Sequence, residues 1–281
     1  MNAPLSRGIA ASARVAWEIE SNWTNVPLYL LYAAVRPLSL CVLLYFLFKV
    51  VTPTPSTDPR FLAIFVGNAF FMIFSGLASG LSWAIISDRE HYQIIRYVYI
   101  APIPFVWTVI GRAMTLLAIS LTSVVLTLVV GRYLLDLPLT IAGTRWTLLL
   151  LSMPLGLLAT AGIGLFFAGL LLNTARHSLL LAEGVGGVLL LVCGVLYPTT
   201  YLPWWLRPVA WFNPLTHWLE LSRRALGAGG FDKQLSALPD WLSLLALAIL
   251  AAVSITAGWK SFLWFEHRAK RAGRIDQTTN Y

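Results

Sequence analysis

The chain has 281 residues, of which 58% are hydrophobic and only 11% are charged, and its formal net charge at pH 7 is +8. A soluble domain carries about 25% charged and about 45–50% apolar residues, so this composition excludes an ordinary soluble protein and predicts an integral membrane protein. The positive charge does not indicate nucleic-acid binding, because no basic cluster alternates with aromatic residues on a polar module. We therefore expect residues 1–281 to form a single membrane domain. We expect this domain to contact membrane lipid and not to bind nucleic acid.

Residues 1–27 are predicted to form an amphipathic helix that lies in the membrane surface. One face of the helical wheel is polar and carries Arg7, Arg14, Glu18 and Ser21. The opposite face is apolar and carries Ile9, Ala13, Ala16 and Trp17. A frayed tail with accidental periodicity is the alternative. A cleaved signal peptide is not expected, because the first apolar run begins near residue 28 and is too long for one.

Six apolar runs are long enough to cross a bilayer, because a hydrocarbon core about 30 Å thick requires about 20 helical residues. The runs cover residues 28–51, 61–84, 104–131, 145–172, 179–197 and 240–264. We therefore predict an all-α integral membrane protein with six transmembrane helices. The fifth run is the shortest and opens close to Glu183. A carboxylate inside a bilayer costs about 2.5 kcal/mol or more, so Glu183 either forms an intramembrane polar site or lies near the cytoplasmic interface.

The distribution of Lys and Arg predicts the orientation, because cytoplasmic connections retain these residues. With six spans both termini share a side. The segments on that side are rich in Arg and Lys, and they cover residues 1–27, 86–103, 173–178 and 265–281. The short loops opposite contain only Arg60, Arg132 and Arg145. We expect both termini, including the tail 265–281, to be cytoplasmic in a multi-pass protein of the plasma membrane, or of the inner membrane in a bacterium.

Residues 86–103 form a charged connection between the second and third apolar runs. As a helix over residues 88–100 it would lie flat on the cytoplasmic surface, with Arg89, Gln93 and Arg96 on one side. Pro102 and Pro104 would end it. One interpretation is a connector whose charges are solvated, and the other is a rigid lever that is presented to a cytoplasmic partner.

Small residues recur every four positions in the second and fourth runs, and they are Gly76, Gly80, Ala84, Gly156, Thr160, Gly164 and Ala168. Such ridges allow helices to approach closely. Packing within the monomer is the favoured interpretation, and contact between subunits is the alternative.

The external segment 198–239 is predicted to contain a pair of short re-entrant or surface helices. Pro198 and Pro203 would break the fifth span near the outer surface. Asn213 can cap a helix that begins at Pro214, and Gly227 marks its end. Within that helix Glu220 lies within one turn of Arg223 and Arg224. Trp204, Trp205 and Trp211 suit the boundary between water and lipid, so an aromatic anchor belt is the simpler interpretation.

Two stretches of this sequence resemble motifs of one family. The first contains Asp88-Arg89-Glu90, Ala101-Pro102-Ile103 and Gly111-Arg112, and the second contains Gly194 with Pro198, Leu202-Pro203-Trp204, Asn213-Pro214-Leu215-Thr216 and Arg223. In this order they resemble the permease subunits of ABC-2 type ATP-binding-cassette exporters. His91-Tyr92-Gln93-Ile94 replaces the G-T-L-E that the family usually has at this point.

The resemblance implies a membrane subunit that is driven by a separate cytoplasmic ATP-binding-cassette ATPase, which would bind ATP and Mg. It implies two copies of the chain, or a pair with a similar permease, around a path for a hydrophobic small molecule, a lipid or a lipid-linked glycan. The residues that it assigns to coupling with the ATPase are Asp88, Arg89 and Glu90, and we add Arg96 from the same connection. The residues that it assigns to an external gate are Gly194, Pro198, Pro203, Asn213 and Pro214.

The sequence contains no pattern of an enzyme or a metal protein. Cys41 and Cys193 lie in apolar runs, the four histidines are scattered, and no nucleotide-binding or hydrolase motif is present. We expect no cofactor and no metal in this chain. An ion-coupled secondary transporter is the main alternative, because Glu183 could serve it, but no repeat relates the two halves. A membrane-embedded enzyme and a structural scaffold explain the two motifs less well.

Overall fold

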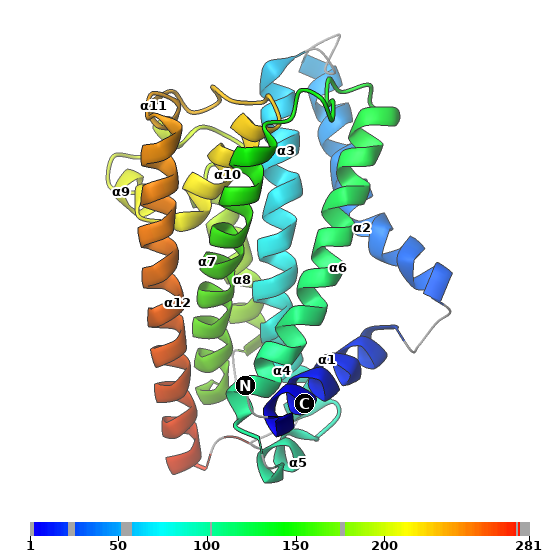
Figure 1. Cartoon of the computed structure of the whole chain (residues 1–281), viewed down its shortest axis with the longest axis vertical. Helices are drawn as coiled ribbons and strands as arrows, with labels where there is room; N and C mark the ends of the chain where they lie inside the picture. Colours follow the sequence, from blue (N-terminus) through cyan, green and yellow to red (C-terminus); the bar gives the residue numbers. More distant parts are fainter. Residues whose placement is uncertain are drawn as a thin grey trace.

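Helices make up all the regular secondary structure of the described residues in the computed structural model (Figure 1). The structure describes residues 3–21, 26–51, 58–101, 103–174, 178–273 and 275. The all-α class predicted from the sequence is therefore confirmed for this part of the chain.

Four helical segments among the described residues are long and apolar enough to cross a membrane. The first, Pro59–Glu90, joins α3 (Pro59–Phe74), a π-helical turn η2 (Ser75–Ser79) and α4 (Gly80–Glu90). The others are α6 (Phe105–Tyr133), α7 (Trp146–Asn173) and α12 (Asp240–Arg271). They match four of the predicted spans, and the chain is a multi-pass membrane protein.

The other two predicted spans are helical but shorter in their described apolar part. The run 28–51 lies in α2 (Val26–Val51), whereas only residues 179–192 of the run 179–197 lie in α8 (Ser178–Val192). The prediction that Pro198 ends the fifth span is wrong, because the helix has already ended at Val192. Gly194 then turns the chain with φ of 69°, a left-handed value that glycine adopts at little cost. Six spans therefore stay a prediction.

The bundle has two distinct ends, and α3 lies at its centre (Figure 1). One end, which we call the connector end, holds α1 (Ala3–Ser21), α5 (Ile95–Ile100) and the last turns of α12. The loop end holds η3 (Thr199–Tyr201), α9 (Arg207–Trp211), α10 (Pro214–Ala225) and α11 (Lys233–Ser236). Helix α10 packs against α3, α7 and α12, and nearly all of its side chains are buried.

Helices α7 and α12 lie side by side over most of their length (Figure 1). They cross where Gly162 faces Gly258, and a Cβ atom on Gly258 would lie only 2.1 Å from the Gly162 carbonyl oxygen. A Cβ on Gly162 would lie 2.4 Å from the carbonyl oxygen of Ser254. Only glycine on both helices permits this approach of the two backbones.

Replacing Gly258 by alanine should lower the free energy of unfolding by about 1–3 kcal/mol, because the methyl group forces the two helices apart. The control is Gly187→Ala in α8, where a Cβ would meet nothing within 4 Å. That change should be neutral or stabilise the helix by up to about 1 kcal/mol. Thermal unfolding in detergent measures both, and equal effects of the two substitutions would contradict the close crossing.

The ridges of small residues pack within the chain, as the favoured interpretation predicted. On α7, Gly156 makes room for the indole ring of Trp218 in α10. In the first spanning segment, Gly76 of η2 faces Ser120 and Gly80 of α4 faces Leu116. Both of these partners lie in α6.

Candidate functional site

A turn and the short helix α5 (Ile95–Ile100) connect α4 to α6. Helix α4 ends at Glu90, and the amides of His91 and Tyr92 both donate to the Ser87 carbonyl, at 2.9 and 2.8 Å. Gln93 then has φ of 52°, a left-handed value that no helix accommodates. The predicted continuous helix over residues 88–100 is therefore wrong, and α5 begins only at Ile95.

Asp88 anchors the end of α4 to α6. Arg112 of α6 donates to the Asp88 carboxylate at 2.7 Å and to the Ala84 carbonyl at 3.2 Å. Both charged side chains are buried, with relative exposures of 5% for Asp88 and 10% for Arg112. A buried pair with such a short hydrogen bond holds two helices in a fixed relation, because breaking it leaves a buried charge alone.

Arg89 anchors the same turn to α7. Its Nη1 donates to the Leu171 carbonyl at 3.1 Å, and its Nη2 pairs with Glu90 at 3.0 Å. The Arg89 side chain is 1% exposed. The expectation that Arg89 lies on the surface of a flat cytoplasmic helix is wrong, because its guanidinium faces α7. Asp88 and Arg89 instead form the base of the connection.

The exposed tip of the connection consists of different residues, which the charge pattern of the sequence did not single out as contact residues. It contains Tyr92, Gln93, Tyr97 and Ile100. Tyr97 is 74% exposed and Ile100 is 79% exposed. The side chain of Arg96, a predicted coupling residue, lies outside the described residues. Tyrosine is one of the residue types that most often anchor protein contacts.

Helix α1 packs across α6 beside this base. The Thr115 hydroxyl donates to the Ala13 carbonyl at 2.8 Å, and a Cβ on Gly111 would lie 2.7 Å from the Ile9 carbonyl oxygen. Burial raises the pKa of Glu20, and the positive charge of Arg112 opposes that shift.

The predicted amphipathic faces of α1 hold in part. Ile9 and Ala16 are buried, and Arg14 pairs with Glu18 on the exposed side at 3.0 Å. Ser21, expected on the polar face, is instead buried, and its hydroxyl donates to the Trp17 carbonyl at 2.7 Å.

Arg223 in α10 joins three segments at the loop end. It donates to the Ala63 carbonyl of α3 at 2.8 Å and to the Gly194 and Val195 carbonyls after α8, both at 2.9 Å. Its guanidinium carbon also lies 4.5 Å from the centre of the Phe231 ring. Burial lowers the pKa of Arg223 to about 10, so the guanidinium stays charged at neutral pH.

A second group of charges joins α10 to the start of α12. Asp240 accepts from Arg224 at 2.9 Å and from Arg145 at 2.6 Å. Arg224 also approaches Glu220 at 3.4 Å, and the Ser236 hydroxyl donates to Glu220 at 2.8 Å. The predicted neighbourhood of Glu220 with Arg223 and Arg224 is thus present, but Asp240 was not identified from the sequence.

The residues predicted for the external gate adopt local roles in the turns before α10. Asn213 caps α10, since its side chain accepts from the Leu215 amide at 3.0 Å, and Pro214 is the first helical residue. Pro198 and Pro203 flank η3, and both have carbonyls that accept turn hydrogen bonds. Gly194 presents its carbonyl to Arg223 at 2.9 Å.

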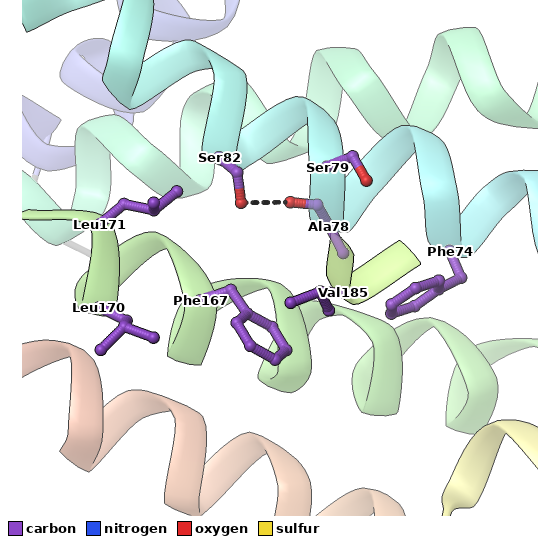
Figure 2. Close-up of a pocket in the computed structure, with 8 residues that line it drawn as sticks. All are labelled: Phe74, Ala78, Ser79, Ser82, Phe167, Leu170, Leu171 and Val185. Atoms are coloured by element: carbon purple, nitrogen blue, oxygen red, sulfur yellow. Dashed lines mark hydrogen bonds between the residues drawn. The ribbon is translucent and has the colours of Figure 1, made fainter. Parts of the chain in front are cut away.

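A small hollow opens between the first spanning segment, α7 and α8, and we call it the side hollow (Figure 2). It is lined by Phe74, Ala78, Ser79, Ser82, Phe167, Leu170, Leu171 and Val185. The Ser82 hydroxyl donates to the Ala78 carbonyl at 3.0 Å, so the lining is largely apolar. The side chain of Glu183, the predicted intramembrane polar site, lies outside the described residues.

These features define a multi-pass helical membrane protein with an anchored connection at one end and a buried short helix at the other. A family model described as ABC-2 type transporter matches residues 12–226, which is most of the chain. The chain belongs to the ABC-2 type transporter family and is a transport permease. Helix α12 lies beyond the matched residues. The comparison with curated proteins found no match.

Proposed function

We propose that this chain is the membrane-spanning subunit of an ATP-driven exporter and that a separate cytoplasmic ATPase drives it. In this proposal the connector end is cytoplasmic, α2 and α8 complete six spans, and ATP and Mg bind to the partner alone. Two copies, or this chain and a similar permease, enclose the path. The observation that carries the proposal is the connection itself, an exposed tip with two tyrosines on a buried charged base.

The exposed tip is suited to bind a partner and to be displaced by it. An ATPase would pack against the rings of Tyr92 and Tyr97 and the aliphatic side chain of Ile100. The base is suited to transmit a displacement of the tip to the membrane helices, because Asp88 is bonded to α6 and Arg89 to α7. Movement of the tip would then shift two membrane helices together rather than bend a loop.

The cargo that suits this chain best is a hydrophobic small molecule or a lipid. The side hollow has apolar walls from Phe74, Phe167 and Leu170, and it lies beside a π-helical turn, a feature that occurs often at functional sites. At the other end, α10 and the turns that Arg223 holds would form the gate through which the cargo leaves.

An ion-coupled secondary transporter is the second candidate, and the position of Glu183 in an apolar helix favours it. Such a protein would move its cargo along an ion gradient without any ATPase. Reconstitution of the chain alone therefore separates the two candidates.

ATP turnover in proteoliposomes tests the proposal, with the chain and each ATP-binding-cassette ATPase of the source organism reconstituted in turn. Tyr97→Ser should weaken ATPase binding about 30-fold, as loss of a contact worth about 2 kcal/mol does. The control is Tyr133→Ser, because Tyr133 is 80% exposed but lies at the end of α6, near the loop end.

The proposal fails if no ATPase binds the wild-type chain and the chain alone moves solute along an ion gradient. If an ATPase binds but Tyr97→Ser and Tyr133→Ser behave alike, the exporter stands and the tip is not the contact.

A further inference from the structure

A stack of aromatic rings joins α5 to α12 at the connector end. The ring of Tyr99 in α5 lies 4.6 Å from that of Phe105, the first residue of α6, at an interplanar angle of 23°. Phe105 stacks in turn on Phe262 of α12, at 6.0 Å and 19°. Beside this stack Trp107 meets Trp259 edge to face at 5.7 Å. The stack therefore links α5 to α12 through Phe105 of α6.

The side chain of Lys270 in α12 also contacts the Tyr99 ring. The ammonium group of Lys270 lies 4.8 Å from the centre of the Tyr99 ring, and the Glu266 carboxylate holds it at 2.7 Å. Burial and the charge of Glu266 raise the pKa of Tyr99, so its ring is neutral. Its hydroxyl is buried without a hydrogen-bond partner. The ring faces, rather than the hydroxyl, therefore hold α5 against α12.

Helix α12 is one continuous helix that contacts α7 and α10. It has 32 residues, which as an α-helix extend about 48 Å. Its backbone meets α7 at Gly258, and the side-chain Nδ2 of Asn173 at the end of α7 donates to the Phe265 carbonyl at 2.9 Å. At the far end Asp240 is bonded to Arg224 of α10 at 2.9 Å.

We propose that Tyr99 and Phe105 are positioning residues that fix the angle between α6 and α12, so that a displacement of α5 reaches α10 through Asp240. The driving of α5 by an ATPase rests on the proposed function, but the mechanical link does not. The link runs along a helix outside the residues that match the family model. It gives the connector end a direct route to the loop end, parallel to the one through Asp88 and Arg89.

Distances between pairs of spin labels in lipid nanodiscs test the link without a partner. Labels go on cysteines that replace exposed residues, with Cys41 and Cys193 changed to alanine. One pair, Tyr97→Cys with His267→Cys, reports on the connector end, and the other, Leu134→Cys with Trp241→Cys, reports on α6 and α12 at the loop end.

Phe105→Leu should broaden the distance distribution of both label pairs, because it removes the central ring of the stack. Tyr99→Leu should have the same effect. The matched control is Tyr99→Phe, which keeps the ring and removes only an unbonded hydroxyl, so both distributions should stay narrow. Thermal unfolding confirms that each variant is folded.

Broadening at the connector end alone would overturn the proposal, since α12 would then not carry the change. So would broadening with Tyr99→Phe. In the reconstituted complex, ATP should shift the loop-end distance of the wild type, and Tyr99→Leu should abolish that shift while the ATPase still binds. Absence of any ATPase that binds the wild type would count against the proposed function and leave the nanodisc result intact.

Discussion

Replacing Arg223 by leucine should lower the free energy of unfolding by about 3–5 kcal/mol. The substitution leaves the Ala63, Gly194 and Val195 carbonyls without their donor in a buried site. It also removes one of the two cations beside the Glu220 carboxylate, the one at 4.0 Å, and leaves Arg224 at 3.4 Å. Because these carbonyls belong to α3 and to the turn after α8, the variant should also lose the fixed position of that turn. Unfolding in mixed detergent micelles measures the loss.

Two further variants show whether the geometry or the charge of Arg223 matters. Arg223→Lys keeps the charge, but lysine lacks the planar guanidinium that reaches all three carbonyls. It should therefore recover only part of the stability. Arg60→Leu removes an exposed arginine at the start of α3 and should change the free energy by no more than about 0.5 kcal/mol. An effect of Arg223→Leu as small as that of Arg60→Leu would show that the three carbonyls find other donors.

Replacing Asp88 by alanine should destabilise the protein by about 3–5 kcal/mol, because Arg112 then stays buried without the carboxylate that pairs with it at 2.7 Å. Exchanging the two charges, Asp88→Arg with Arg112→Asp, should recover part of this loss. A double-mutant cycle on unfolding in detergent gives the coupling energy of the pair, which we expect between about 0.5 and 3 kcal/mol. The same cycle on ATP turnover should show that the exchange restores coupling.

The pair Arg14 and Glu18 is the matched control, since it joins an arginine and an acid at 3.0 Å but has side chains that are 81% and 50% exposed. Its coupling energy should not exceed about 1 kcal/mol. If the exchange of Asp88 and Arg112 recovers neither stability nor turnover, the pair is not the anchor of the connection.

The helices and the cap of α10 could be predicted from local patterns. Long apolar runs are sufficient for a spanning helix, and Asn213 followed by Pro214 is sufficient for a helix start, because both depend on neighbours in the chain. The ion pairs of Glu220 with Arg223 and Arg224 follow in the same way from helical spacing.

The partners of the buried charges could not be predicted in this way. Arg89 donates to the carbonyl of Leu171, 82 residues away, and a backbone acceptor has no signature in the sequence. The left-handed Gln93 likewise had no local signal, because glutamine rarely adopts this conformation. The sequence thus identified the connection as unusual but assigned its charges to the surface.

The π-helical turn η2 determines which way the end of α4 faces. In such a turn the hydrogen bonds span five residues instead of four, so it adds one residue within a continuous helix. Each residue of an α-helix turns the chain by about 100°, so the helix after η2 is rotated by that amount relative to an uninterrupted one. Asp88 meets α6 and Arg89 meets α7 in this rotated register, and Ala78 and Ser79 of η2 line the side hollow. A change of η2 to a regular α turn would therefore reorient the whole base of the connection without moving the rest of α3.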